Sequence, residues 1–517
     1  MARAPLSIPA HLDVPLTPVR HRGLLMVAIM GASIVQFLDA TIANVAVPHM
    51  QTQLGATAES VTWVLTSFII ATAVATPIVG WLADIFGTRR LFLVAVAGFT
   101  LASMLCGIAV NLTEMVGFRI LQGIFAAMIG PLSQSIMLDI NKPSEHAKSM
   151  AIWSMGVMIA PITGPMIGGW LTESFSWRWV FYVNLPVGIP TLAILWWLLP
   201  SRPLRPRKLD LSGYVLFALG LGALQLMLDR GQGEDWFQSW EILIEGALAI
   251  ACLWMFAVRM ATARNPLFPL GLVGNRNFAA TLCFGVIIGI VMIALSALLP
   301  PMLQSLFGYT VLDTGIVMAP RGVGVVVSMM IAAKTINHVG ARPLIALGLS
   351  ICALTLWMMS GWSLAVDWNH IMITGFIQGL GMGLCFMPLN VLAFSTIDPK
   401  YRTDGSGLFN MSRSLGASIG ISLMTTVLAR SLQTSHSDLA AHVTSFNMPA
   451  VDLSSADRLG EYGEAALRIL DSIINQQAAM IAYINDFWLM AVLVAVSVPL
   501  IFVTREARPG AHLPVGE

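Results

Sequence analysis

Long apolar segments make up most of this chain, and they restrict how it can fold. Fourteen segments are about 17 to 25 residues long, the length at which a helix crosses the hydrocarbon core of a bilayer. Lipid offers no partners for backbone N–H and C=O groups, so we expect each segment to be a helix, which satisfies them internally. The segments lie at roughly 24–48, 62–82, 91–110, 114–137, 150–172, 179–199, 211–228, 242–260, 278–300, 314–333, 343–363, 370–394, 407–429 and 487–503.

The composition is typical of a membrane protein and argues against other classes. The 517 residues are 56% hydrophobic and 11% charged, whereas soluble domains carry about 25% charged residues. The net charge of +1 gives no sign of nucleic-acid binding. The five cysteines fall in apolar segments and the nine histidines in tails, loops or helix ends, so we expect no disulfide framework, metal site or cofactor. The sequence predicts an all-α polytopic membrane protein that is not an enzyme.

The basic residues predict an orientation. An even number of helices places both chain ends on one side of the membrane. If that side is cytoplasmic, twenty of the 28 Lys and Arg residues lie in cytoplasmic segments and three lie within helices. The five outside are Arg178, Arg230, Arg430, Arg458 and Arg468. Because short cytoplasmic segments are enriched in Lys and Arg, we predict that both termini are cytoplasmic.

Three short matches recur at a nearly constant offset, which indicates a duplication. Val47-Pro48 is matched by Leu299-Pro300, Gly87-Thr-Arg89 by Gly340-Ala-Arg342, and Gln122-Gly123 by Gln378-Gly379, at offsets of 252, 253 and 256 residues. Two six-helix halves with two extra helices between them, a 6+2+6 arrangement, would account for this pattern. We predict a tail at 1–22, a six-helix bundle at 23–200, a two-helix insertion at 201–265, a second six-helix bundle at 266–505 that includes an outside loop at 431–486, and a tail at 506–517.

One apolar segment is unusually rich in glycine and proline. Residues 156–169, GVMIAPITGPMIGG, hold two prolines and four glycines. In a membrane bundle, neighbouring helices can satisfy the backbone groups that proline frees, and glycines form a groove for a second helix. We interpret this segment as a tightly packed helix that can also bend. An ordinary kinked helix is the alternative.

Four motifs resemble one family of transporters. They are LDATIANVAVP at 38–48, GWLADIFGTRR at 80–90, RILQG at 119–123 and the segment 156–169. Together they resemble the fourteen-helix drug:proton antiporters of the major facilitator superfamily, over nearly the whole chain. Two further stretches, WRWVFYVNLPVG at 177–188 and LDRGQGEDWF at 228–237, are similar to the EmrB-type exporters in particular. Ile85 departs from the pattern, since the superfamily often has Arg or Lys there.

The resemblance implies a fold and a function. It implies a major facilitator fold and multidrug efflux, in which lipophilic or amphipathic small molecules leave in exchange for protons. It places the protein in the bacterial inner membrane, with a periplasmic adaptor (membrane fusion) protein and an outer-membrane channel as partners. It assigns proton coupling to Asp39 and Arg119, a conformational latch to Asp84, Gly87 and Arg89, and an antiporter motif to Gly156, Pro161, Gly164, Pro165, Gly168 and Gly169.

Asp39 is suited to proton exchange on physical grounds. It lies mid-helix on a face with Ala32, Gln36, Ala43 and Ala46, which we interpret as bordering a cavity. An intramembrane carboxylate is costly unless it is protonated or paired. Burial favours the neutral acid, whereas a nearby cation favours the carboxylate, so a moving cation would release the proton. A structural, hydrogen-bonded Asp is the alternative. Asp39→Asn is expected to abolish exchange and leave the protein folded.

Four other charged residues in or next to apolar segments have both a functional and a structural interpretation. Arg119 provides a fixed positive charge, although it could instead bond to backbone carbonyls. Arg321 and Arg413 are weaker candidates, since each could equally snorkel or pair structurally. Asp84 is expected at the positive end of the helix that begins near Gly405, or else as a solvated loop acid.

The sequence says less about the substrate. We expect six polar or aromatic side chains near a central cavity: Gln36, Trp63, Gln134, Trp153, Asn390 and Asn410. The chain has no Gly-Lys dipeptide and hence no Walker A loop, so an ion gradient should supply the energy. An exporter of one endogenous class of compound, such as a fatty acid, bile salt or siderophore, is the alternative function.

The predicted outside loop at 431–486 has an amphipathic pattern. Apolar residues recur at helical spacing, namely Leu467, Leu470, Ile474, Ala478, Ile481 and Ile484. Polar residues lie between them, namely Arg468, Asp471, Asn475 and Gln476. This pattern predicts a helix that lies on the membrane or against a partner, and we interpret the segment as part of the docking surface for the adaptor.

Overall fold

The structure is a computed structural model, and it is helical throughout the part of the chain that it describes. That part comprises residues 13–57, 60–204, 207–395, 397–442 and 461–503. Within it, fourteen helices or helix runs are long and apolar enough to cross a membrane, and these residues form no strand. The prediction of an all-α polytopic protein with fourteen spans is confirmed.

The elements follow one another in a simple order. The first part contains α1 (Arg22–Gln53), η1 (Ser60–Thr62), α2 (Trp63–Ala75), η2 (Thr76–Ile78), α3 (Val79–Phe86), α4 (Thr88–Ile108), α5 (Leu112–Asp139), η3 (Pro143–Glu145), α6 (His146–Ser174), α7 (Trp179–Tyr182) and α8 (Asn184–Leu198). The middle contains α9 (Leu211–Arg230), η4 (Trp236–Gln238), α10 (Trp240–Thr262) and α11 (Leu270–Val273). The last part contains α12 (Arg276–Phe307), α13 (Val311–Val339), α14 (Ala341–Met359), α15 (Trp368–Ser395), η5 (Pro399–Tyr401), α16 (Arg402–Ala441), α18 (Glu461–Leu500) and η6 (Ile501–Val503).

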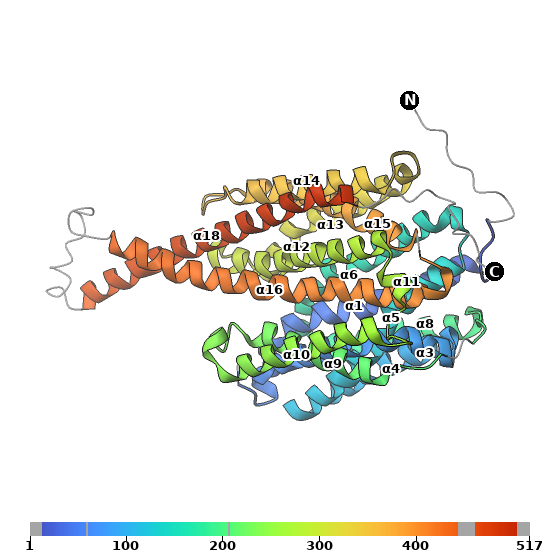
Figure 1. Cartoon of the computed structure of the whole chain (residues 1–517). Coiled ribbons are helices and arrows are strands. Elements are labelled where there is room, and N and C mark those ends of the chain that lie inside the picture. Colours follow the sequence, from blue (N-terminus) through green and yellow to red (C-terminus); the bar gives the residue numbers. More distant parts are fainter. Residues whose placement is uncertain (1–12, 58–59, 205–206, 396, 443–460, 504–517) are drawn as a thin grey trace.

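The long helices run side by side in two sets (Figure 1). In the N-terminal set, α1 packs against α5, α6 and α8, and α5 packs against α2 and α4. In the C-terminal set, α15 packs against α13 and α14, and α18 packs against α12, α14 and α16. α9 and α10 pack on each other, and α9 contacts one helix of each set, α2 and α16. The 6+2+6 division and the side on which the termini lie stay predictions.

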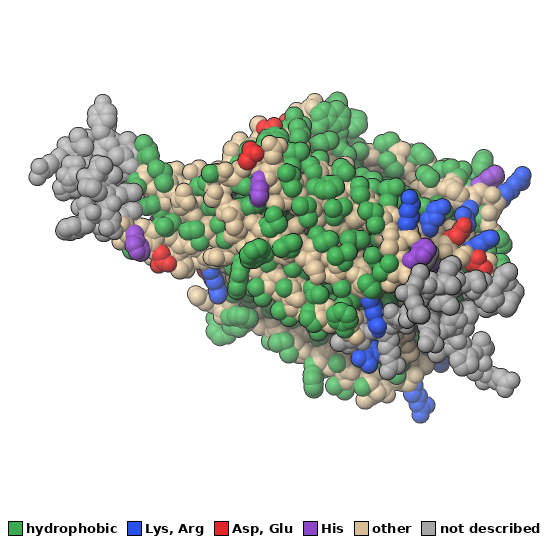
Figure 2. All heavy atoms as spheres, turned by 90° about the horizontal axis from the view of Figure 1, so that it is seen from above, with side chains coloured by type: hydrophobic (Ala, Val, Ile, Leu, Met, Phe, Trp, Pro, Cys, Tyr) green, Lys and Arg blue, Asp and Glu red, His purple; other side chains and the backbone are tan. Residues whose placement is uncertain are grey.

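Basic side chains concentrate at one end of the bundle (Figure 2). We call this the basic end; α1 and α16 begin there, and α18 ends there (Figure 1). Its arginines include Arg22, Arg207 and Arg402, each ion-paired with a carboxylate. By the distribution of Lys and Arg, we expect this end to face the cytoplasm.

Two pairs of glycines at the repeat offset have matching geometry. Gly87 and Gly340 each link two consecutive helices with a positive φ, 84° and 91°, which a residue with a side chain rarely adopts. A Cβ on Gly123 would lie 2.6 Å from the carbonyl oxygen of Phe68, and a Cβ on Gly379 would lie 2.1 Å from that of Arg321. Each glycine therefore lets its helix approach the backbone of a neighbour.

The last two long helices extend well beyond the bounds predicted from the sequence. α16 and α18 are 40 residues each, or about 60 Å at 1.5 Å per residue, twice the roughly 30 Å of a hydrocarbon core. Figure 1 shows both projecting past the other helices, away from the basic end. The described part of the predicted 431–486 loop therefore continues these two helices as the arms of a hairpin.

The amphipathic pattern in this segment packs against a helix of the same chain. Five of its apolar residues are buried or half-buried, namely Leu470, Ile474, Ala478, Ile481 and Ile484, while Arg468, Asp471, Asn475 and Gln476 are exposed. The side chain of Leu467 and residues 443–460 lie outside the described part. α18 packs along α16, and Nε2 of His436 lies 3.2 Å from Oδ1 of Asp471. The apolar stripe therefore belongs to a helix that packs against α12, α14 and α16 of the same chain.

Candidate functional site

Asp39 lies at the centre of a buried polar network in the N-terminal set. Its Oδ2 atom is 2.6 Å from Nη1 of Arg119. Its Oδ1 atom accepts hydrogen bonds from Gln122 Nε2 at 2.8 Å and from Asn184 Nδ2 at 2.9 Å. All four residues are at most 1% exposed. The structure thus brings together Asp39 and Arg119, the two residues to which the resemblance assigns proton coupling.

Arg119 is held by several further contacts. Its Nε donates to the carbonyl of Val64 at 2.9 Å, and Nη1 donates to Oε1 of Gln122 at 2.7 Å. Its guanidinium lies 4.2 Å from the ring centroid of Phe68, within the range of cation–π attraction. Asn184 also donates to Ser103 at 2.8 Å, so residues of α1, α2, α4, α5 and α8 meet at this point.

This arrangement can act as a proton-sensitive switch. A buried carboxylate that gains a proton loses its attraction for a neighbouring guanidinium. Protonation of Asp39 would therefore weaken its contact with Arg119, and the bonds from Gln122 and Asn184 would have to rearrange. All five helices belong to runs that are long enough to cross a membrane, so this rearrangement would act on several membrane-length helices at once.

One expectation about Asp39 needs correction, and another stays a prediction. On the face that we interpret as bordering a cavity, Ala32, Ala43 and Ala46 are buried like Asp39, whereas Gln36 is half-buried, and the cavity itself stays a prediction. The correction concerns Asp39→Asn, which would leave Arg119 buried without its counter-ion, contrary to the expectation of a simple neutral replacement. Removing one partner of a buried ion pair typically costs about 3–5 kcal/mol.

The glycines of the segment 156–169 pack against α1. A Cβ on Gly164 would lie 2.3 Å from Oγ1 of Thr41, and one on Gly168 would lie 2.8 Å from Cγ1 of Ile42. A Cβ on Gly156 would lie 2.7 Å from the terminal methyl of Met30 and 3.6 Å from Cδ1 of Ile34. The helix is continuous from His146 to Ser174, through Pro161 and Pro165, and Gly169 is also buried. The segment thus brings α6 close to the helix that carries Asp39.

A second polar cluster joins the two sets of helices. Gln134 of α5 donates to Asn390 of α15 at 3.3 Å and accepts from Asn410 of α16 at 3.0 Å and from Ser406. Arg413 donates to Asn410 at 3.0 Å. Three of the expected substrate residues, Gln134, Asn390 and Asn410, therefore meet here.

Gln36 and Arg413 extend this cluster toward α1. A Cβ on Gly130 would lie 3.6 Å from Oε1 of Gln36 and 3.9 Å from Asn410, so Gln36 is near the cluster. The Arg413 guanidinium lies 5.2 Å from the ring of Phe37 and 5.4 Å from that of Phe386. Oε1 of Gln36 and Nη1 of Arg413 are buried without a hydrogen-bond partner. These two atoms could bind a polar group of a substrate.

The two tryptophans expected near the cavity form no hydrogen bond with this cluster among the described residues, and their place at a cavity stays a prediction. Trp153 is fully buried and donates to Ser33 at 3.1 Å, between α6 and α1. Trp63 begins α2, next to Val64, and is 37% exposed. Trp153 therefore joins the helix packing around α1, and Trp63 lies close to the backbone that binds Arg119.

At the basic end, Arg207 connects α3 with α16. Its guanidinium lies 3.0 Å from Asp84 and 2.7 Å from Asp404, which is in the first turn of α16. Its carbonyl accepts a hydrogen bond from Trp81 at 3.0 Å. Asp84 is thus linked to the start of α16 through Arg207, which belongs to the segment after α8, and its interaction with the dipole of α16 stays a prediction.

The other latch residues have local roles in this conformation. Gly87 forms the turn between α3 and α4, and Arg89 donates to the carbonyl of Trp196 at 2.7 Å. A second link between the sets is made by Asp139 at the end of α5, whose Oδ1 lies 3.1 Å from Arg402 of α16. Asp139 also pairs with Arg202.

Sequence reasoning missed several of these residues. Asn184 belongs to the quoted stretch 177–188, so a signal was present although its role was not recognised. Arg207 is one of the twenty Lys and Arg residues that were counted as cytoplasmic, and that count orients the chain without assigning a role to any one of them. Asp139, Arg402 and Asp404 lie at helix ends, where charged residues are common and carry no distinctive pattern.

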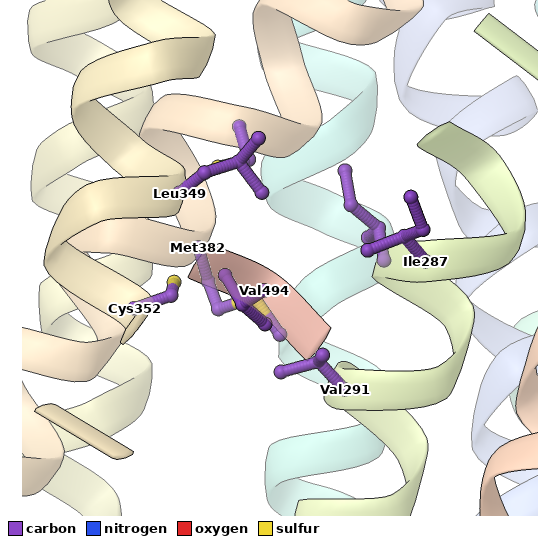
Figure 3. A pocket seen from close by; sticks show the side chains of 8 residues that line it. Ile287, Val291, Leu349, Cys352, Met382 and Val494 are labelled. Carbon is purple, nitrogen blue, oxygen red and sulfur yellow. The ribbon is translucent and has the colours of Figure 1, made fainter. Parts of the chain in front are cut away.

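A small apolar pocket lies inside the C-terminal set (Figure 3). It is lined by Ile287, Ile288, Val291, Leu349, Cys352, Met382, Cys385 and Val494. No charged side chain lines it, so the pocket offers no group to bind an ion. In the part of the chain that the structure describes, no cluster of three His, Cys, Asp or Glu residues could hold a metal.

Comparisons with known proteins agree with this architecture. A family model described as Major Facilitator Superfamily matches residues 29–421. The chain is 34% identical over 479 residues to Multidrug export protein EmrB of Haemophilus influenzae, covering 90% of this chain and 92% of that protein. It is 34% identical over 513 residues to Fatty acid resistance protein FarB of Neisseria gonorrhoeae, covering 97% of this chain and 99% of that protein.

Solved structures show the same fold. The proton:xylose symporter XylE superposes with a TM-score of 0.60 at 12% identity, over 95% of this chain and 97% of that chain. The human organic anion transporter MFSD10 superposes with a TM-score of 0.56 at 13% identity, over 92% and 99%. At these identities the likeness concerns the fold alone. The family match and the bacterial relatives identify a multi-pass bacterial membrane protein that transports small molecules, a transporter rather than an enzyme. The chain therefore belongs to the major facilitator superfamily, as a transporter of the EmrB type.

Proposed function

We propose that the protein is a proton-coupled efflux transporter of the bacterial inner membrane that exports lipophilic or amphipathic compounds by alternating access. The observation that carries this proposal is the fully buried Asp39, paired with Arg119 and bonded to Gln122 and Asn184. A carboxylate in the membrane interior is a functional candidate by default. Its network connects five helices, which supports the coupling of protonation to helix movement.

The contacts at the basic end support alternating access. Arg402 pairs with Asp139, and Arg207 pairs with both Asp84 and Asp404, so the two sets are tied together at the end expected to face the cytoplasm. Release of these pairs would let the sets separate there. One proton moving down the membrane potential gains about 2.3 kcal/mol per 100 mV, enough to sustain a substantial substrate gradient.

The projecting hairpin of α16 and α18 supports a tripartite assembly. Each helix is about twice as long as a hydrocarbon core is thick, so about half of it extends beyond that core, away from the basic end. We propose that it helps form the docking surface for a periplasmic adaptor protein, which would connect the transporter to an outer-membrane channel. Crosslinking from cysteines at 431–442, on the described arm of α16, to a co-expressed adaptor tests this. The absence of any specific product across the scan would contradict it.

Proton coupling is tested in proteoliposomes with an imposed pH gradient. Asp39→Asn is expected to abolish substrate-induced proton movement. Because that change strands Arg119, the double variant Asp39→Asn/Arg119→Gln, which removes both charges, is measured as well and should fold like the wild type. Glu145→Gln, at a half-exposed ion pair with Arg22, is the control. Near-normal proton movement in a folded double variant would exclude Asp39 as the proton carrier.

Two unneutralised arginines favour anionic amphipathic compounds as a second candidate substrate class. Arg413 binds only the neutral Asn410, and Arg321 donates to Ser296 at 3.4 Å; neither forms an ion pair among the described residues. A buried guanidinium without a counter-ion favours an incoming carboxylate. This fits export of an endogenous anion such as a fatty acid, a bile salt or an anionic siderophore.

A susceptibility panel separates the two candidates. Deletion and overexpression strains are compared for fatty acids, bile salts and several unrelated lipophilic drugs. Resistance to unrelated drugs would favour multidrug export. Resistance limited to anionic amphipathic compounds, and lost in Arg413→Gln, would favour the second candidate.

A further inference from the structure

The C-terminal set contains one buried carboxyl group that differs from all the others. Five aspartates are at most 8% exposed in the described part of the chain: Asp39, Asp139, Asp210, Asp404 and Asp486. The first four each pair with an arginine, respectively Arg119, Arg402, Arg259 and Arg207. Asp486 has no such partner, and neither of its carboxyl oxygens accepts or donates a hydrogen bond.

The surroundings of Asp486 are apolar. It has no exposed surface and lies on α18, which packs against α12, α14 and α16. The ring of the next residue, Phe487, lies 5.9 Å from that of Trp362, whose indole N–H is likewise buried without a partner. Two turns further along α18, Val494 lines the apolar pocket of Figure 3.

Among the described residues, no titratable side chain forms a hydrogen bond or ion pair with the carboxyl group of Asp486. Tyr483, one turn earlier on α18, is the titratable side chain that interacts with Asp486. The charged or titratable side chains on the helices packed against α18 are Arg276 and Cys283 on α12, Arg342 and Cys352 on α14, and Arg402, Asp404, Arg413, Arg430, His436 and Asp438 on α16. None of these bonds to Asp486 in the described part of the chain.

The neutral acid is the form that these surroundings tolerate. An ionised carboxylate without a cation or donor is far more costly to bury than a neutral carboxylic acid. A structural role does not explain the residue, because it makes no bond, and an apolar side chain of similar shape would be equally or more stable. A polar group that persists at a cost to stability points to function.

We propose that Asp486 is a second proton-binding site. It holds a proton in the conformation described here and gives it up when a conformational change brings water or a cation to the carboxyl group. The residue at the repeat offset of 252 from Asp39 is Val291, so the C-terminal set has no carboxylate there and carries its own on α18. The role of Asp486 in the transport cycle rests on the proposed proton coupling. Its protonation in this conformation does not depend on that proposal.

Infrared spectroscopy of the purified protein in lipid tests protonation directly. The C=O stretch of a carboxylic acid is distinct from that of a carboxylate. At neutral pH, Asp486→Asn is expected to remove a carboxylic-acid band from the wild-type spectrum. Asp471→Asn, on the same helix with a side chain 62% exposed, is the matched control and should leave the band unchanged. Identical acid-region spectra for the wild type and Asp486→Asn would overturn the proposal.

A second variant and a transport measurement complete the test. Asp486→Leu should fold with a Tm equal to or above that of the wild type, whereas a clear fall in Tm for both variants would show a structural bond instead. In proteoliposomes, Asp486→Asn is expected to lower the ratio of protons to substrate, and an unchanged ratio would overturn a role in the cycle. If the wild type shows the band but no proton coupling, the proposed function fails while protonation of Asp486 stands.

Discussion

A Cβ atom on Gly80 would lie only 1.8 Å from Oδ1 of Asp404. Gly80 belongs to α3 and Asp404 to the first turn of α16, so helices of the two sets meet at this contact. The same Oδ1 accepts a hydrogen bond from Arg207 at 2.7 Å. The absence of a side chain at residue 80 therefore makes room for the ion pair that ties the sets together at the basic end.

Gly80→Ala is expected to separate these helices. The added methyl group would displace the Asp404 carboxylate from Arg207 and push α16 away from α3. Pulsed electron paramagnetic resonance between spin labels at the basic ends of the two helices should show longer or broader distances than in the wild type. Gly117→Ala is the control, because nothing lies within 4 Å of a Cβ there. Unchanged distances in Gly80→Ala would contradict this role.

Arg207→Ala is expected to destabilise the protein. Asp404 is 5% exposed, so loss of Arg207 would leave a buried carboxylate unpaired, at a cost of about 1–3 kcal/mol. Thermal unfolding in detergent should show a lower Tm, with partial recovery in Arg207→Lys. Lys208→Ala, which removes an exposed neighbouring charge, should have little effect. Equal Tm values for the alanine variants at 207 and 208 would count against the bridge.

The charges of the Asp39 network could be recognised in the sequence, but their bonding could not. Asp39 and Arg119 are charges in apolar segments, which is a strong local signal. Their pairing joins residues 80 positions apart, and Asn184 comes from another helix again. The periodicity of one segment carries no information on which side chains of distant segments meet. It also does not tell whether the small residues beside Asp39 border a cavity or a neighbouring helix, because small side chains suit both equally well.

The lengths of α16 and α18 were underestimated for a different reason. The bounds predicted from hydrophobicity lie near residues 429 and 487, whereas backbone hydrogen bonding continues along the more polar part of each helix. The spacing of Leu470, Ile474 and Ala478 was recognised as helical. An apolar stripe looks the same whether it faces lipid or a second helix, so the sequence did not distinguish the bilayer from α16.

Gly168→Ala and Gly156→Ala are expected to differ, although both glycines belong to the same motif. A Cβ on Gly168 would lie 3.0 Å from the backbone carbonyl of Ile42, which cannot move without displacing α1. A Cβ on Gly156 would crowd the terminal methyl of Met30, which can swing away, and would contact Ile34 at an ordinary 3.6 Å. We expect Gly168→Ala to lower stability by about 1–3 kcal/mol and Gly156→Ala to be neutral, as measured by thermal unfolding. Equal effects would show that the approach of α1 to α6 does not depend on Gly168.

The ion pair between Asp210 and Arg259 should make the stability of α9 depend on pH. Oδ1 of Asp210 caps α9 by accepting from the N–H of Gly213 at 3.1 Å and lies 2.7 Å from Nη2 of Arg259. Burial opposes ionisation, but the bonds from Arg259 and Gly213 outweigh it, so the pKa of Asp210 is lowered from its usual range. A lowered pKa contributes stability above the unfolded value of about 3.9, and this is lost as the pH falls through the folded value.

Asp210→Asn isolates this charge effect, because Asn caps a helix about as well as Asp. We expect the variant to have a lower Tm than the wild type at neutral pH, and the difference to shrink as the pH falls below about 4, where the wild-type carboxylate also becomes neutral. Arg259→Gln should behave in the same way, since it removes the other partner. Thermal unfolding over a pH series measures both. A difference that stays constant across the series would mean that Asp210 acts through its cap alone, and that the ion pair adds nothing to the stability of α9.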